Sequence, residues 1–378
     1  MQILMILVFL GAFIGLIVNT GRKLFLWFRP LFSGASPLAF GVIYGIIMTS
    51  VIVLFVLSRL PDSRIPRVVF LADHYALGVA VYVVMFVNFA DLVLFVLRLS
   101  RMFTSPLPKG AALAAGTAAL VLSVVLSVYG GIHASGIQTK NYEVVLKEDG
   151  KADSMEIALI SDIHLGYVVG ETHLEKIVAA VNAAEPDLVC IAGDIFDGDI
   201  TALENPSGLQ KLFREINAPY GVYACLGNHD AGAGYEGMLE FLEKAQVRLL
   251  QDEEVVIDGR LILAGRKDSG PIGNQGADRT EIDDTAKKEN LPRIVLDHKP
   301  ENIGEYDRRT DLILCGHTHR GQFFPANLIN EATMDVNYGY YRKDAKSPQA
   351  VVTSGAGTWG PPFRIGTDSE VAVIQVTL

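Results

Sequence analysis

Five short polar segments in the second half of the chain contain side chains of the types that bind metal ions. They are Asp162-Ile-His164, Gly193-Asp194, Gly227-Asn-His-Asp230, Asp297-His298 and Gly316-His-Thr-His319. Five of the eight histidines of the chain lie in these segments. Imidazole nitrogen suits zinc, iron and related transition-metal ions, whereas carboxylate and carbonyl oxygens suit harder ions such as manganese. The residue types therefore indicate a pair of divalent metal ions.

Each of these segments follows a predicted β-strand, so the strands must bring them together. From Tyr142 onward, short apolar strands alternate with amphipathic helices, which is typical of an α/β domain. The predicted strands are Glu156–Ser161, Leu188–Ala192, Gly221–Leu226, Arg260–Ala264, Arg293–Leu296, Asp311–Cys315, Ala350–Ser354 and Val371–Thr377, and the predicted helices are Thr172–Ala184, Leu209–Ile216 and Gly237–Ala245. Ligands bind at the carboxyl ends of strands in open α/β sheets. We therefore expect the five segments to converge.

Spacing supports this convergence. Asp162 and His164 are two residues apart, as are His317 and His319, and on extended backbone such side chains point to the same side. In the alternative interpretation, the same residues only stabilise the turns that follow strands, and the histidines pack nearby.

Other parts of the predicted domain carry weaker signals. The polar segment Lys267–Asn290 is expected to form a loop with one short helix. Asp197 and Asp199 are expected on a solvated loop, and His173 is expected to be exposed at the start of a helix. Three residues near the C-terminus are expected either to line the cleft or to approach a bilayer, namely Trp359, Phe363 and Arg364.

In this order, the five polar segments closely resemble the motifs of the calcineurin-like metallophosphoesterase family. The resemblance covers roughly Met155–Leu378, and the closing segment Gly355–Arg364 resembles the membrane-associated bacterial branch of that family. It implies a two-layered β-sandwich flanked by helices, with two divalent metal ions (manganese, zinc or iron) between the sheet ends. It also implies hydrolysis of a phosphate ester or pyrophosphate bond by a metal-activated hydroxide, without a phosphoenzyme.

The resemblance further implies seven metal ligands. Asp162, His164 and His319 would hold one ion, Asn228, His298 and His317 would hold the other, and Asp194 would bridge both. His229 would bind no metal and would act as general acid or electrostatic stabiliser, with Asp230 orienting it. Arg320 departs from the family pattern, in which small residues are common at this position. It is either a contact to the substrate phosphate or a surface charge.

The first third of the chain differs in composition from the rest. The 378 residues are 50% hydrophobic, with a mean hydropathy of +0.31 and a net charge of −10. Residues 1–130 nevertheless have a net charge of +6, so the remainder has −16. An acidic chain without a basic stripe is not expected to bind nucleic acid. We expect a four-helix transmembrane region at 1–130, a linker with the first strand at 131–154, and the metallophosphoesterase domain at 155–378.

Four apolar runs predict a multi-pass integral membrane protein. Each is close to the roughly 20 helical residues that cross a bilayer, and they are Ile3–Val18, Leu38–Leu57, Tyr75–Leu97 and Ala111–Val128. The first run has no basic start and no obvious cleavage site, which favours an uncleaved helix over a secretory signal. With both termini outside, six of the nine basic residues between the runs face the cytoplasm, so the catalytic domain is expected to be extracytoplasmic.

Anchoring in the membrane favours a substrate that lies in the membrane plane, such as a phospholipid, a lipid-linked pyrophosphate or an envelope polymer phosphate. A phosphatase or phosphodiesterase of soluble substrates and a non-catalytic metal-binding sensor are the alternatives. A transporter is a further alternative, which would depend on Asp73, His74 and Asp91. The ester class, the native metals and the oligomeric state stay open at this point.

Overall fold

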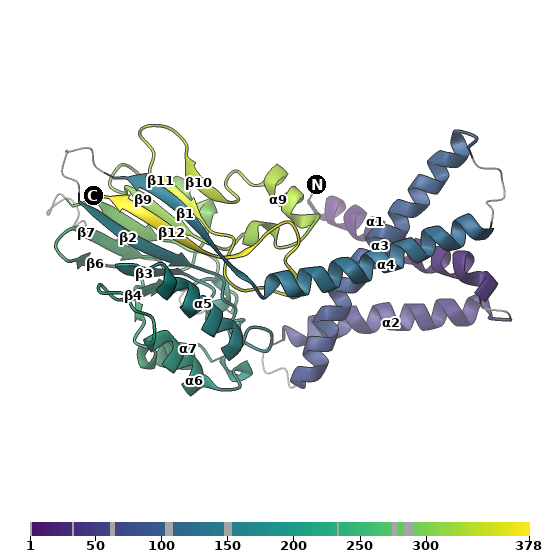
Figure 1. The fold of residues 1–378 in the computed structure, drawn as a ribbon, viewed down its shortest axis with the longest axis horizontal. Coiled ribbons are helices and arrows are strands. Elements are labelled where there is room, and N and C mark those ends of the chain that lie inside the picture. The colour runs from purple at the N-terminus through teal and green to yellow at the C-terminus, as the bar shows by residue number, and fades with distance from the viewer. Residues whose placement is uncertain are drawn as a thin grey trace. The chain divides into compact units, whose positions relative to one another are not determined.

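The computed structural model describes residues 2–31, 34–60, 65–102, 109–146, 153–232, 234–273, 279–282 and 291–378 (Figure 1). The chain forms two compact units, Met1–Tyr129 and Gly130–Leu378. Within the predicted loop Lys267–Asn290, the short helix falls partly on residues 274–278 and 283–290, which lie outside the described residues.

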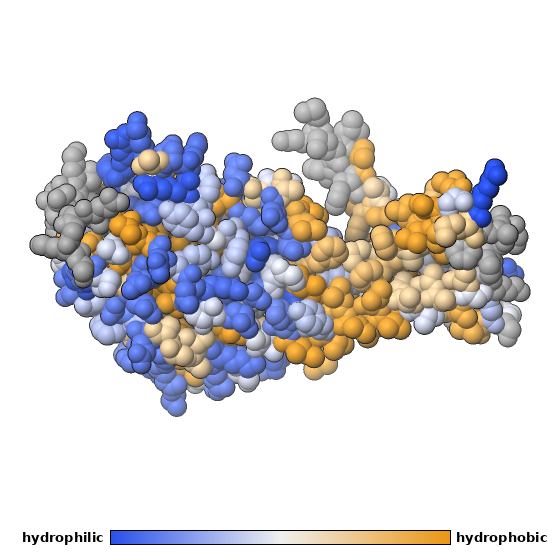
Figure 2. Space-filling model, turned by 45° about the horizontal axis from the view of Figure 1, so that its top comes forward, coloured by the Kyte–Doolittle hydropathy of each residue, from blue (hydrophilic) through white to orange (hydrophobic). Residues whose placement is uncertain are grey.

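The first unit is helical. It contains α1 (Gln2–Phe28), α2 (Pro37–Ser58), α3 (Arg67–Leu99) and most of α4 (Lys109–Ala134), and a 3-10 turn (Arg29–Leu31) follows α1. The side chain of Ser36 accepts a hydrogen bond from the backbone N–H of Ala39, and Pro37 occupies the first turn, so α2 begins with two favoured residues. Apolar side chains dominate the surface of these helices in Figure 2.

Among the described residues, three helices are long and apolar enough to cross a membrane, namely α2, α3 and α4. The first of the four predicted spans coincides with α1, and its crossing of the membrane stays a prediction. Because α1 continues to Phe28, Lys23 lies on the helix and not in the segment that follows it. Its Nζ is 2.5 Å from Oδ1 of Asp91 on α3, so this pair neutralises two charges inside the helical unit.

The second unit contains two six-stranded sheets. The first has the order β1-β12-β2-β3-β4-β5 and the second has the order β10-β11-β9-β8-β7-β6. The strands of the first sheet are β1 (Ile137–Val145), β12 (Ser369–Thr377), β2 (Ser154–Ile160), β3 (Leu188–Ala192), β4 (Val222–Cys225) and β5 (Arg248–Leu249). Those of the second are β10 (Gly339–Arg342), β11 (Gln349–Val352), β9 (Leu312–Cys315), β8 (Arg293–Leu296), β7 (Leu261–Gly265) and β6 (Glu253–Ile257).

Parallel pairing aligns the strand ends that matter for the site. β2, β3, β4 and β5 run parallel to one another, and so do β7, β8, β9 and β11. The edge strands β6 and β10 pair antiparallel with their neighbours. All eight predicted strands have a counterpart here, so the α/β prediction is confirmed, and β12 is inserted between β1 and β2.

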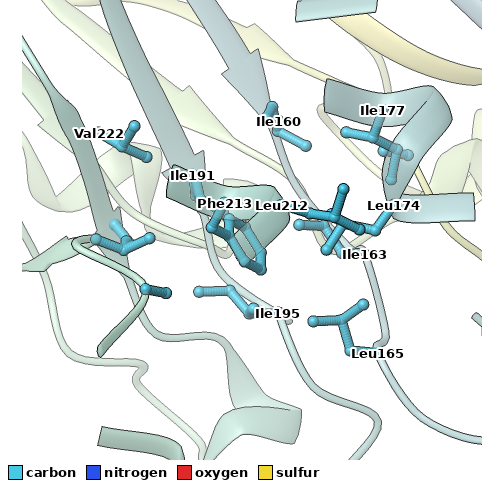
Figure 3. Packing of buried hydrophobic residues seen from close by; sticks show 14 of the residues in the cluster. Ile160, Ile163, Leu165, Leu174, Ile177, Ile191, Ile195, Leu212, Phe213 and Val222 are labelled. Atoms are coloured by element: carbon cyan, nitrogen blue, oxygen red, sulfur yellow. The ribbon is translucent and has the colours of Figure 1, made fainter. Parts of the chain in front are cut away.

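Side chains alternate between two cores along β2. Ile157 and Leu159 lie in the cluster between the sheets. Ala158 and Ile160 face the helices α5 (Glu171–Ala183), α6 (Pro206–Arg214) and α7 (Tyr235–Lys244), as the close view in Figure 3 shows for Ile160. Burying one such aliphatic side chain contributes about 1.5–3 kcal/mol. The two sheets are therefore held together, and one is covered by helices, as the family resemblance implies.

Short helical elements complete the unit. They are the 3-10 helices η2 (Ile200–Ala202), η3 (Asn228–Ala231), η4 (Pro300–Glu305) and η5 (His319–Gly321), and helix α9 (Ala326–Thr333). None of them was expected from the sequence, because an element of one or two turns has too few residues to show the helical period.

Candidate metal centre

The five polar segments converge at the carboxyl ends of strands from both sheets. Asp162 and His164 follow β2, Asp194 follows β3 and Asn228 follows β4, while His298 follows β8 and the two remaining histidines follow β9. The two sheets meet at the site through a hydrogen bond of 2.8 Å, which Nδ1 of His298 donates to the carbonyl oxygen of Ala192 at the end of β3.

The first group of potential ligands consists of Asp162, His164 and His319, all of them buried. The Nε2 atoms of the two histidines are 3.0 Å apart, and Nε2 of His319 is 3.4 Å from Oδ1 of Asp162. The carboxylate of Asp162 is oriented by the backbone N–H of His317, which donates to both of its oxygens at 3.1 and 3.0 Å. These side chains can hold one ion between them.

The second group surrounds Nε2 of His298. This atom is 3.2 Å from Oδ1 of Asn228, 3.2 Å from Oδ2 of Asp194 and 3.3 Å from Nδ1 of His317. The same Oδ2 of Asp194 is 3.7 Å from Nε2 of His164 in the first group. Asp194 therefore lies between the two groups, where a bridging carboxylate would be needed.

The electrostatics of this second group fit a cation. Because Nδ1 of His298 donates its hydrogen to a carbonyl group, Nε2 of the neutral ring carries a lone pair that faces a carboxylate oxygen and an amide group. Burial alone would lower the pKa of His298, but the charge of Asp194 raises it to about 10. Burial would likewise raise the pKa of Asp194, yet His298 holds it well below its usual range. The cluster thus stabilises positive charge at its centre.

Two of the other three ligand histidines, His317 and His319, are in the form that binds metals. Burial lowers the pKa of His317 to about 4, and burial together with the neighbouring His164 lowers the pKa of His319 well below its usual value. Both imidazoles are therefore neutral near pH 7, and a neutral imidazole is the metal-binding species. This set of nitrogen and oxygen donors fits two divalent transition-metal ions.

The backbone at these ligands differs from the expected conformation. Five of the seven have positive φ angles: 52° at Asp162, 53° at His164, 51° at Asp194, 72° at His317 and 48° at His319. The expectation of extended backbone in the two His/Asp-x-His pairs was therefore wrong, although the side chains do converge. A non-glycine residue in this left-handed region costs about 1–2 kcal/mol, and such strain is concentrated at functional sites.

His229 and Asp230 extend the site beyond the ligands. The ring of His229 lies 5.0 Å from that of His164 and 5.8 Å from that of Trp359, and its backbone N–H donates to Asp194 at 2.8 Å. Asp230 is fully buried and accepts hydrogen bonds of 2.8 Å from the backbone N–H groups of Phe196 and Gly227. Burial and the charge of Asp194 raise the pKa of Asp230 to about 7. Its carboxylate therefore holds the loop that presents His229.

Two expectations about residues near the site were wrong. Oδ1 of Asp197 is 3.5 Å from Nδ1 of His164, so Asp197 does not lie on a solvated loop. Asp197 also forms a third group of potential ligands with His164 and His229. His173 is only partly exposed, because its Nε2 donates to the carbonyl oxygen of Ala356 at 2.8 Å. Asp199 is partly exposed and caps η2, as expected of a loop residue.

Arg364 has a different role from the one expected from the sequence. It is 0% exposed, and Phe363 is 1% exposed, so neither lines an open cleft, whereas Trp359 is 38% exposed. The guanidinium of Arg364 donates to the carbonyl oxygen of His319 at 3.1 Å and lies 3.4 Å from Nδ1 of that ring. It also donates to the carbonyl oxygens of Gly355 and Gly357, at 3.2 and 2.7 Å. Arg364 therefore fixes the position of His319.

The residues that flank the ligands have structural partners. Asp297, next to His298, accepts hydrogen bonds from Nη2 of Arg279 at 2.5 Å, from the hydroxyl of Tyr306 at 2.5 Å and from Asn302 at 2.9 Å. The guanidinium of Arg320 lies over the ring of Tyr338, 4.3 Å from its centroid. A contact of Arg320 to substrate stays a prediction.

The chain belongs to the calcineurin-like phosphoesterase family. The model of that family, described as calcineurin-like phosphoesterase, matches residues 155–321, which include all five polar segments. A metallophosphoesterase of Aquifex aeolicus is 30% identical over 262 residues, covering 68% of this chain and 98% of that protein.

Two further relatives extend the comparison. A metallophosphoesterase of Campylobacter jejuni is 32% identical over 267 residues, which cover 68% of each chain. A Danio rerio protein named transmembrane protein with metallophosphoesterase domain is 30% identical over 272 residues, covering 68% of this chain and 61% of that protein. The family supports metal-dependent phosphoesterase activity, and the apolar helices together with the last relative indicate membrane association.

Proposed function

We propose that this protein is a dinuclear metal-dependent phosphoesterase that hydrolyses a phosphate ester or pyrophosphate bond of a membrane lipid or envelope component. The observation that carries the proposal is the position of Asp194, whose Oδ2 lies 3.2 Å from His298 and 3.7 Å from His164 and so joins two clusters of imidazole, amide and carboxylate ligands. Two bound ions would neutralise the phosphoryl oxygens and activate water at neutral pH.

The protein's own residues prepare the site for this reaction. Asp162, His164 and His319 form one half of the centre, Asn228, His298 and His317 form the other half, and Asp194 joins them. His229 stands beside this centre without belonging to the second cluster. We assign to His229 the donation of a proton to the leaving oxygen. A general acid must lie within hydrogen-bond reach of the oxygen that it protonates, and His229 is beside the centre where that oxygen would leave. Asp230 keeps the loop of His229 in place.

Membrane anchoring supports the choice of substrate. An enzyme tethered to a bilayer encounters lipids at a raised local concentration. Trp359, which is 38% exposed and lies beside His229, presents an apolar ring close to the reacting groups. We further propose four membrane spans with an extracytoplasmic catalytic unit, on the basis of the basic residues between the spans.

The test uses the full chain, purified in detergent and loaded with manganese, zinc or iron, with metal content measured by elemental analysis. We expect turnover of an aryl phosphodiester that EDTA abolishes, and faster turnover of a phosphorylated lipid in mixed micelles. Asp194→Asn and His229→Ala should each reduce kcat/KM by about 10²-fold or more. Asp199→Asn is the matched control, since it changes a partly exposed aspartate five residues from Asp194 that belongs to none of the ligand groups, and it should retain activity.

Metal-loaded protein without turnover of any phosphate ester would refute the enzymatic function and favour a metal sensor. Equal rates on soluble and lipid esters would retain the enzyme but refute the lipid substrate. Protease accessibility of the second unit in intact cells tests the proposed topology.

A further inference from the structure

A groove with a volume of about 760 Å³ runs between α1 and α2 in the helical unit. Its walls are almost entirely apolar, and they include Ile14, Val18 and Leu26 of α1, which are 51, 62 and 46% exposed. Apolar side chains in a groove of this kind favour a hydrocarbon occupant.

The floor of the groove on the α2 side is kept open by glycine. Gly41 and Gly45 both line it, and a Cβ atom added to either would meet no other atom within 4 Å. At Gly21 on the opposite helix, a Cβ would instead meet the ring of Tyr44 at 2.6 Å. The space beside the two glycines of α2 is therefore open.

The half of the groove that is lined by the last turns of α1 is positively charged. Arg22 and Arg29 both line it, and neither has a hydrogen-bond or ion-pair partner among the described residues. The adjacent Lys23 differs, because Asp91 neutralises it at 2.5 Å. Two uncompensated cations in one half of an apolar groove complement a negatively charged head group with attached hydrocarbon chains.

The dimensions agree with a lipid of one leaflet. Arg22 and Ile14 are eight residues apart on α1, which is about 12 Å of helix. This length is close to half of the hydrocarbon thickness of about 30 Å. A second copy of this chain is disfavoured as the occupant, because it would add like charges to a region whose net charge is already +6.

We propose that this groove is a binding site for an anionic phospholipid, with its phosphate between Arg22 and Arg29 and an acyl chain along Ile14 and Gly45. The site is distinct from the metal centre. Each arginine near a membrane surface contributes about 1 kcal/mol to binding an anionic lipid, so the two together select phosphatidylglycerol over phosphatidylcholine by about 30-fold.

Native mass spectrometry of the full chain in detergent, titrated with phosphatidylglycerol or phosphatidylcholine, measures this preference. Arg22→Gln/Arg29→Gln should lower phosphatidylglycerol affinity about 30-fold. Arg98→Gln/Arg101→Gln is the charge-matched control outside the groove and should retain wild-type affinity. Gly45→Leu should weaken both lipids by filling the groove, and leucine favours the helical state more than glycine does.

Several results would overturn the proposal. One is equal affinity for the two lipids, and another is an equal loss of phosphatidylglycerol affinity in both double variants. The third is unchanged lipid binding in Gly45→Leu. Each would indicate only general attraction of lipid to a charged or apolar surface. A dimer that Gly45→Leu converts to a monomer would identify a second copy as the occupant. Turnover of the aryl phosphodiester should be retained in all these variants, so failure here is distinguishable from failure of the proposed function.

Discussion

Replacing Arg364 by lysine is expected to loosen the metal centre while leaving all seven ligands in place. Lysine keeps the positive charge but has one nitrogen at its tip, whereas the guanidinium reaches the carbonyl oxygen of His319 through Nη1 and the carbonyl oxygens of Gly355 and Gly357 through Nη2. The substitution therefore loses at least the bond to the His319 carbonyl group. Burial lowers the pKa of Arg364 to about 10, so the charge is held in the interior at a free-energy cost that the remaining bonds must offset.

The magnitude follows from that lost bond. A hydrogen bond from a charged donor contributes about 1.5–3 kcal/mol, and a loss of about 2 kcal/mol lowers the apparent Tm of a domain of this size by roughly 4–8 °C. Removing a group that orients a metal ligand typically weakens metal binding by about 10- to 100-fold. The Arg364→Lys variant should thus require a higher metal concentration for half-maximal activity and recover turnover when metal is in excess.

Dialysis against buffered metal, followed by elemental analysis and a thermal melt, measures both quantities. Arg320→Lys is the matched control, because Arg320 adjoins the same His319 but its guanidinium lies on Tyr338. This control should bind metal with wild-type affinity. If Arg364→Lys also retained wild-type metal affinity and Tm, the assignment of Arg364 as a positioning residue would be wrong.

Two further predictions concern stability. Asp297→Asn should destabilise the protein by about 3–5 kcal/mol. It removes the buried negative charge that pairs with Arg279 and the oxygen that accepts the hydrogen bond of the Tyr306 hydroxyl. The exposed Asp307→Asn should cost less than about 1 kcal/mol, and equal losses in thermal melts would contradict the importance of the buried network. Burial lowers the pKa of His173 below its ordinary 6.5, so as pH falls through 6.5 the unfolded chain takes up a proton that the folded chain does not. Between about pH 7.5 and pH 5.5 the wild type should therefore lose more Tm than His173→Gln, and parallel losses would exclude this contribution.

The sequence predicts the framework of the second unit well, because its signals are local. Each predicted strand is a short apolar run, and each polar segment directly follows a strand, so the parallel order of the strands suffices to bring Asp162 close to Asp194 in one sheet and His298 close to His317 in the other. The left-handed backbone at the ligands has no comparable signal. It depends on tertiary contacts, such as the backbone hydrogen bond from His164 to Asp194, that no sequence period encodes.

The role of Arg364 could not be predicted for a related reason. Its acceptors are carbonyl oxygens, which every residue carries. One belongs to His319, more than 35 positions away in the sequence, and another belongs to Gly357 in the same loop as Arg364. An arginine embedded in a run of glycine, proline and phenylalanine is the only hint in the sequence. His173 was misjudged similarly, because its partner is the backbone of Ala356.

The pairing of β1 with β12 constrains how the second unit is made in the cell. β1 is the first of these strands to leave the ribosome, but among the described residues it pairs only with β12, and β2 also pairs with that strand. More than 200 residues separate Val145 from Ser369, which at about 5–20 residues per second is roughly 10–45 s of translation. During that interval the nascent chain holds β1 unpaired and the apolar strand β2 without one of its two neighbours, so we expect this stage of synthesis to depend on chaperones.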